Sequence, residues 1–323
     1  MDVANLPTLI EIESIADQIN AVVPPTPQFS WPLLDQRLGC ELWVKHDNHT
    51  TIGSFKIRGA VNYVARLVTR GGLIKGVITA TRGNYGQAVA FAARRHGLTS
   101  TIVVPHCNSL EKNRAMRGLG AELIEHGEDF QAALIYSEQL ARERQLHWIP
   151  AFHSDLVWGN AVSALNFFRQ TPTLDYVYIS IGMGSGICAV LAARDALGLS
   201  TRIIGVVSER APAFARSFDA RRLITHPTST RIADGMACST PHPEALDIIM
   251  RGVERIVCVS DEEVEAGMRA YFADTHNVAE GAAGAGLAAV IREGDVVRGK
   301  RVGVILTGGN VDSVTFARVL AEK

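Results

Sequence analysis

The chain has 323 residues and a formal net charge of −1, so no basic field favours nucleic acid or an anionic membrane as a partner. Apolar residues make up 47% and charged residues 20%, which is ordinary for a globular protein long enough for two domains. The five cysteines are scattered without a C-x-x-C pair, and no apolar run is long enough to span a membrane. We therefore expect a cytoplasmic protein without a disulfide framework.

In chain order, short runs rich in Val and Ile alternate with segments of helical periodicity. The runs that predict strands are 41–45, 76–80, 100–105, 121–126, 176–181, 202–207, 255–260 and 301–307. The segments that predict helices are 56–69, 84–97, 110–118, 129–144, 157–169, 187–198, 261–275 and 282–293. The stretch 19–32 is expected to be irregular, and 209–243 is expected to be a loop-rich cover. This alternation predicts an α/β fold with largely parallel sheets flanked by helices.

The segment "GSFKIRGA" opens the first long helical pattern. Ser54 is expected to cap this helix, which places Lys56 in its first turn. The helix dipole disfavours a charged lysine there and lowers its pKa, so a neutral, nucleophilic amine becomes easier to reach. The alternative is an ordinary solvated lysine, and spacing alone does not decide between the two.

Two further strand ends carry polar side chains. In the turn "TRGNY", Asn84 is either a helix cap or an amide that faces a ligand. In "ILTGGNVD", Thr307 ends a strand, and its hydroxyl is either a ligand contact or a satisfied buried group. Asn310 is expected to cap the final helix.

A glycine-rich loop follows the strand predicted at 176–181. Its residues are Gly182, Met183, Gly184, Ser185 and Gly186. Alternate glycines let the backbone approach an anion closely, and the following helix supplies free N–H groups. A phosphate site and a tight turn of small residues both fit this pattern. The G-x-G-x-G spacing differs from the dinucleotide fingerprint, which disfavours a nicotinamide oxidoreductase.

Taken in order, these segments resemble the pyridoxal-phosphate enzymes of the tryptophan-synthase β (fold type II) group, and within it the serine/threonine dehydratases and serine racemases. "GSFKIRGA" is similar to the family's Schiff-base lysine motif, and "GNYGQAVA" to its substrate-carboxylate loop. "GMGSG" resembles its phosphate cradle, and "TGGN" the strand end that faces the pyridine nitrogen. "ADGMA" (233–237) and "AEGAAGAGLAAV" (279–290) also resemble family segments. The resemblance covers roughly residues 5 to 320.

The resemblance implies pyridoxal 5'-phosphate as cofactor, with Lys56 as the Schiff-base lysine and Phe55 beside the ring. It also implies that Asn84 binds the phenolic oxygen, that residues 182–186 hold the phosphate, and that Thr307 meets the ring nitrogen. The substrate loop comprises Thr81, Arg82, Gly83, Asn84 and Tyr85. The family fold implies a small inserted domain, 43–147, within a larger domain formed by 1–42 and 148–323. A homodimer is expected.

The implied activity is that of an ammonia-lyase, which converts a β-hydroxy amino acid such as L-threonine or L-serine to a 2-oxo acid and ammonia. A hydroxyl at Thr307 does not strongly favour a protonated pyridine, so a long-lived carbanion is disfavoured. Prompt β-elimination therefore suits the site better than transamination. Two alternatives stay open: β-replacement, as in cysteine synthases, and a non-catalytic amino-acid sensor on the same fold.

Arg82 and Tyr85 depart from the family pattern, which has a small residue, often serine, and a histidine there. The resemblance to racemases implies that this serine acts there as a second acid/base. A protonated arginine cannot accept a proton, so racemisation is disfavoured for this chain. Arg82 has three possible roles: pairing with a second substrate carboxylate, as in 3-hydroxyaspartate, lying over an aromatic substituent, as in phenylserine, or binding surface acids. No metal is expected, because Pro212 and Phe214 stand where ligands would be.

Overall fold

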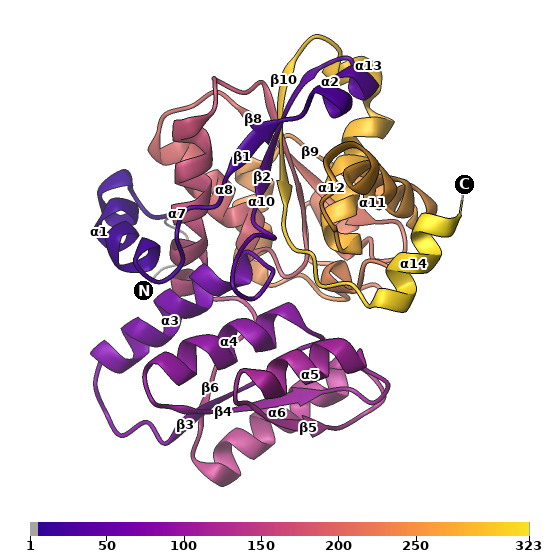
Figure 1. The fold of residues 1–323 in the computed structure, drawn as a ribbon. Helices are drawn as coiled ribbons and strands as arrows, with labels where there is room; N and C mark the ends of the chain where they lie inside the picture. Colours follow the sequence, from indigo (N-terminus) through magenta and orange to yellow (C-terminus); the bar gives the residue numbers. More distant parts are fainter. Residues whose placement is uncertain (1–5, 323) are drawn as a thin grey trace.

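The computed structural model describes residues 6–322 and contains two sheets (Figure 1). The larger sheet has the strand order β1-β2-β10-β7-β8-β9, and every pairing except that of β1 with β2 is parallel. Its strands are β1 (Gln28–Ser30), β2 (Glu41–His46), β7 (Tyr176–Ser180), β8 (Arg202–Ser208), β9 (Arg255–Val259) and β10 (Arg301–Leu306). The expected α/β fold is confirmed.

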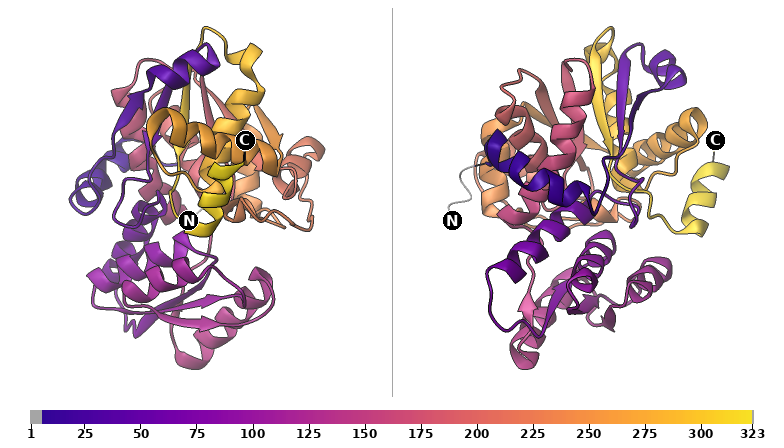
Figure 2. Two further views of the ribbon diagram at one scale, coloured as in Figure 1. Left: turned by 45° about the vertical axis from the view of Figure 1, so that its right-hand side comes forward. Right: turned by 60° about the vertical axis from the view of Figure 1, so that its left-hand side comes forward.

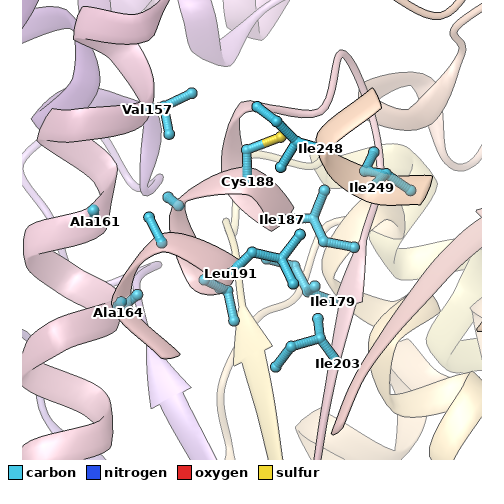
Figure 3. Close-up of a cluster of buried hydrophobic side chains, with 14 of the residues drawn as sticks. Val157, Ala161, Ala164, Ile179, Ile187, Cys188, Leu191, Ile203, Ile248 and Ile249 are labelled. Carbon is cyan, nitrogen blue, oxygen red and sulfur yellow. The ribbon is translucent and has the colours of Figure 1, made fainter. Parts of the chain in front are cut away.

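The strands of the larger sheet bury side chains on both faces, and successive residues point to opposite faces. Val177 and Ile179 join one core, while Tyr176 and Tyr178 join the other. The first core is closed by α1 (Leu9–Asn20), α7 (Ser154–Gln170), α8 (Ser185–Ala196), α9 (Ala213–Ala220) and α10 (Pro243–Gly252). Figure 3 shows α8 inside this core, among side chains of α7 and α10. The second core is closed by α2 (Pro32–Leu38), α11 (Asp261–Thr275), α12 (Gly281–Arg292), α13 (Gly294–Val297) and α14 (Ser313–Ala321).

The smaller sheet is entirely parallel, in the order β5-β4-β3-β6. Its strands are β3 (Gly76–Ala80), β4 (Thr99–Val104), β5 (Glu122–Glu125) and β6 (His147–Trp148). One face packs against α3 (Lys56–Thr69), α4 (Asn84–Arg95) and α5 (Leu110–Gly118), and the other against α6 (Phe130–Arg144). In both views of Figure 2 this sheet and its helices form the lower unit of the molecule.

Two segments expected to be irregular contain regular structure. The stretch 19–32 includes β1 and ends at the first residue of α2, and 209–243 contains α9 and a short 3₁₀ helix, η1 (Asp234–Met236). Prolines caused part of this error, because Pro32 and Pro243 are the first residues of α2 and α10. A proline is well tolerated there, since the first helical N–H has no intrahelical partner.

Candidate active site

One cavity lies between the two sheets, lined by residues that directly follow β3, β7 and β10. The first residues of α3, α4 and α8 complete its wall. Every residue that the sequence predicts for the site lines this cavity: Phe55, Lys56, Thr81, Arg82, Gly83, Asn84, Tyr85, Gly182, Met183, Gly184, Ser185, Gly186 and Thr307. Segments more than 200 residues apart therefore meet at the carboxyl ends of parallel strands, as ligand sites in α/β folds do.

Lys56 is the first residue of α3, and the turn before it is fixed by hydrogen bonds. The backbone N–H of Lys56 donates weakly to Ser54 Oγ (3.4 Å), and that of Phe55 donates to the Thr307 carbonyl (3.0 Å). Ser54 also forms an isolated bridge with Gly308, so this turn is joined to the end of β10. The predicted cap is thus one residue further from the helix than expected, with Phe55 at the cap position itself.

The Lys56 amine has no hydrogen-bond partner among residues 6–322, and its nitrogen lies 4.8 Å from the centre of the Phe55 ring. Burial lowers the pKa of Lys56 from 10.5 to about 8, and the carboxylate of Glu280 partly opposes that shift. Desolvation by burial is therefore the main cause of the lowered pKa, whereas the sequence pattern indicated the helix dipole as the cause. Near pH 8 a large fraction of this amine is neutral, and only the neutral form is a nucleophile or a base.

Asn84 is the first residue of α4, and its side chain does not cap the helix. Its amide nitrogen donates to both carboxylate oxygens of Glu280, at 2.8 and 2.9 Å. The amide oxygen of Asn84 accepts from Asn310 Nδ2 at 2.8 Å. Asn310 Nδ2 also donates to the Ile52 carbonyl oxygen. Asn310 therefore orients Asn84 instead of capping the last helix, whose cap position belongs to Asp312. The prediction for Asn310 was wrong.

The loop after β7 has the backbone of an anion site. Gly184 precedes α8 with a φ of 98°, in the left-handed region that favours glycine, and no side chain caps the helix. The first N–H groups of α8 are therefore free to bind an anion at the cavity. A Cβ on Gly182 would lie 2.4 Å from the Gly235 carbonyl oxygen, and one on Gly186 would lie 3.3 Å from the Phe55 ring. Close packing thus requires glycine at position 182, whereas a side chain at position 186 would need the Phe55 ring to shift by a few tenths of an ångström.

Thr307 carries an unsatisfied polar group. The residue is 4% exposed, and Oγ1 has no hydrogen-bond partner among the described residues. A buried hydroxyl without a partner costs free energy, so such groups in native proteins usually have a ligand or water as partner. Of the two alternatives, the structure contradicts the satisfied buried hydroxyl.

Two residues of the substrate loop differ in what they offer a ligand. The Tyr85 hydroxyl donates to the Pro150 carbonyl (2.6 Å), so Tyr85 presents its ring rather than a free hydroxyl. Burial raises the pKa of Tyr85 well above its usual value. Arg82, in contrast, is partly buried in the cavity wall and has no ion pair or hydrogen bond from its side chain within residues 6–322. The possibility that Arg82 binds surface acids is therefore wrong.

Sequence reasoning missed three charged residues of this cavity: Lys112, Asp234 and Glu280. Lys112 donates to Asp234 at 2.6 Å, which joins α5 to η1 across the cavity. Burial raises the pKa of Glu280 to about 7, an effect opposed by Lys112. Asp234 and Glu280 lie in the two family-like segments "ADGMA" and "AEGAAGAGLAAV", which were the available signal. No sequence signal indicated Lys112, because in the sequence it resembles an ordinary lysine on a helix surface.

Pro212 and Phe214 lie at the start of α9, and Phe214 is buried in the first core. In the part of the chain that the structure describes, no group of three His, Cys, Asp or Glu side chains is placed to hold a metal ion. The described helices also include none with the length and apolar character needed to cross a membrane.

These features define an enzyme site for a phosphate-bearing carbonyl compound: a buried reactive amine, a free helix N-terminus and an unsatisfied hydroxyl in one cavity. The sequence matches the pyridoxal-phosphate dependent enzyme family over residues 19–308. The chain therefore belongs to this family, and its cofactor is pyridoxal 5'-phosphate. The donor set fits that group, because the amine, the anion site and the hydroxyl are all without protein partners.

Two curated relatives match nearly the whole chain. It is 30% identical to the L-threonine ammonia-lyase of Thermotoga maritima, over 97% of this chain and 78% of the relative. It is also 30% identical to the L-threo-3-hydroxyaspartate ammonia-lyase of Saccharomyces cerevisiae, over 98% of both chains. Among solved structures, maize serine racemase superposes with a TM-score of 0.90 at 26% identity and covers 98% of both chains. The fold type II architecture is thereby shown.

Proposed function

We propose that this enzyme converts a β-hydroxy amino acid, such as L-threonine or L-serine, to a 2-oxo acid and ammonia. The observation that carries the proposal is the partner-free Lys56 amine, which shares its cavity with the anion site at the start of α8. The names of the two ammonia-lyase relatives support this reaction over β-replacement. The water lost with the β-hydroxyl is regained when the released enamine is hydrolysed, so the net products are the 2-oxo acid and ammonia.

In this proposal Lys56 binds the cofactor covalently, Phe55 packs beside its ring, and residues 182–186 hold its phosphate. Thr307 offers its partner-free hydroxyl to the ring's nitrogen, and Asn84 donates to the ring's oxygen in place of a contact that it now makes with Glu280. When bound, pyridoxal phosphate supplies the electron sink for bond breaking at the substrate Cα. The lowered pKa of Lys56 lets its Nζ accept the Cα proton near neutral pH.

The substrate's α-carboxylate is proposed to bind the turn before α4. Gly83 occupies the cap position without a side-chain cap, so the first N–H groups of α4 are available to an anion. The Gly83 N–H itself donates to Thr81 Oγ1 (3.0 Å), which fixes the shape of the turn. These N–H groups and Lys56 line the same cavity, so they can hold one small amino acid between them.

The test is a 2-oxo-acid and ammonia assay with threonine, serine, 3-hydroxyaspartate and phenylserine. We expect both products in equal amounts from at least one of these, and a borohydride-trapped cofactor adduct on Lys56. Lys56→Ala should lose both signals, whereas Lys300→Ala, an exposed lysine just before β10, should keep them. No elimination product from any member, or a thiol amino acid formed from O-acetylserine and sulfide, would contradict the proposal.

We propose three further features from the family resemblance: a homodimer, a cytoplasmic location, and a small domain at 43–147 within a larger one. The strands of the smaller sheet all lie between 76 and 148, which supports the domain division. Because β2 (Glu41–His46) pairs within the larger sheet, we place the first boundary after His46. Light scattering of the purified protein tests the dimer.

A further inference from the structure

The wall of the cavity formed by the turn before α4 carries a cation without a partner. Arg82 stands between Thr81 and Gly83 in this turn, lines the cavity, and has no side-chain ion pair or hydrogen bond within residues 6–322. A guanidinium keeps its charge at any working pH and presents a planar fork of donors. A group of this kind in a binding cavity is suited to a planar anion.

The neighbouring charges support Arg82 as the group that binds an anion. The stem of Lys112 packs against the same turn, since a Cβ on Gly83 would lie 2.6 Å from Lys112 Cδ. Lys112 already has a carboxylate partner, because its amine donates to Asp234 at 2.6 Å. The second carboxylate of the cavity, Glu280, is bound by Asn84, so Arg82 is the cation of this wall that has no carboxylate partner.

We propose that Arg82 selects substrates with a second carboxylate on the β-carbon, of the 3-hydroxyaspartate type. This inference rests on the proposed function and on the binding of the α-carboxylate at the start of α4. Arg82 directly precedes the cap residue Gly83 and lines the same cavity, so it belongs to the turn that forms that anion site. In this proposal a four-carbon dicarboxylate binds both groups, with one carboxylate at the N–H groups and one at the guanidinium. Threonine and serine leave Arg82 unpaired.

The proposed reaction is balanced without a further reactant. The Cα–H and β-carbon–oxygen bonds break, the hydroxyl leaves as water, and a second water hydrolyses the enamine. The products from 3-hydroxyaspartate are oxaloacetate and ammonia. The second carboxylate takes no part in bond breaking, so Arg82 acts on binding and orientation.

The experiment compares kcat/KM for threo-3-hydroxyaspartate, threonine and phenylserine in the wild type, Arg82→Ala and Arg82→Lys. Because a charge-assisted bidentate contact is lost, the hydroxyaspartate-to-threonine ratio should fall by about 10- to 100-fold in Arg82→Ala. Arg82→Lys should recover part of it, since lysine keeps the charge and loses the fork. Arg95→Ala, which removes an exposed arginine at the other end of α4, should leave the ratio unchanged.

A binding measurement separates this inference from the proposed reaction. Succinate and butyrate differ by one carboxylate, and succinate should raise the melting temperature of the cofactor-loaded wild type more than butyrate does. Arg82→Ala should abolish that difference. An unchanged substrate ratio together with an unchanged succinate effect would overturn the role of Arg82, as would a loss confined to phenylserine. A wild type without any elimination activity would overturn the proposed function, and the succinate comparison would still decide the role of Arg82.

Discussion

Replacing Arg58 by methionine should destabilise the protein strongly, because it breaks a buried ion pair next to the reactive lysine. Arg58 follows Lys56 by two residues and donates to Asp47 at 2.8 Å, and their side chains are 0% and 4% exposed. Asp47 also accepts from Thr26 Oγ1 (2.7 Å) and Ser163 Oγ (2.9 Å). Burial is the largest single effect and opposes ionisation of Asp47, yet Arg58, Lys45 and the two hydroxyl donors together hold the pKa of Asp47 below its ordinary value.

The magnitude follows from the geometry. At an effective dielectric constant of about 20, unit charges separated by 2.8 Å attract by about 6 kcal/mol, part of which is offset by desolvation. Removing one partner leaves the other charge buried, which costs about 3–5 kcal/mol. For a protein of this size the melting temperature should fall by about 4–7 °C. Arg144 and Glu122 also lie 2.8 Å apart but are 43% and 52% exposed, so Arg144→Met should cost far less stability than Arg58→Met.

Calorimetry of the cofactor-free variants across pH measures both effects. Because the folded pKa of Asp47 is depressed, its stabilisation is present above the unfolded pKa and is lost as the pH falls through the folded pKa. The stabilities of wild type and Arg58→Met should therefore converge in acid. Adding Asp47→Asn to Arg58→Met should restore part of the loss at neutral pH. If Arg58→Met were no more destabilising than Arg144→Met, the reasoning would be refuted.

Three further variants test other parts of the cavity. Gly184→Ala forces a side chain to a φ of 98° and places its Cβ 2.7 Å from a side-chain atom of α10. Absorbance titration should therefore show that the affinity for the cofactor is reduced at least about tenfold. The control variant Gly198→Ala, at φ 63° with open space around it, should lower stability without changing cofactor affinity. The pKa of Glu280 is about 7 in the folded protein against an ordinary 4.5, so ionisation of this carboxyl group lowers the folding stability as the pH rises between those values. Glu280→Gln should therefore stabilise the cofactor-free protein at pH 8 by about 1–3 kcal/mol, with no gain at pH 4. Lys112→Met removes the ion pair between α5 and η1, so the melting temperature should fall by a few degrees and KM for the amino acid should rise; an unchanged KM would exclude a role of this pair in substrate binding.

The strand ends of this fold could be predicted from sequence because they carry local signals. Alternation of Val-rich runs with helical segments located the long strands, and the glycines after β7 marked the anion site. Short elements such as β1 and β6 were missed because two or three residues show no period. The helices that begin at Pro32 and Pro243 were missed because proline was taken only as a breaker.

The polar contacts inside the cavity depend on tertiary structure, and no local pattern contains them. The partner of Asn84 is Glu280, 196 residues away, and the partner of Lys112 is 122 residues away. The order of the motifs predicted which residues meet, but only their packing determines which side chains neutralise one another. Arg82 illustrates this point, since its lack of a partner is a property of the folded cavity alone.

Polar contacts connect the smaller sheet's unit to the larger one, and two of them lie at the cavity. Asn84 binds Glu280, Lys112 binds Asp234, and Glu111 on α5 accepts from Ser313 at the start of α14 (2.6 Å from its hydroxyl). Apolar packing joins the two units elsewhere, because Leu156 of α7 belongs to the buried cluster formed by α3 and α4. We therefore expect any relative motion to open and close the interface at the cavity, where these contacts are polar. A ligand that touches both sides then favours the closed arrangement by the difference in its affinity for the two states. An amino acid held between the start of α4 and Lys56 is such a ligand, because α4 belongs to the smaller unit and the Lys56 turn is bound to β10 of the larger one.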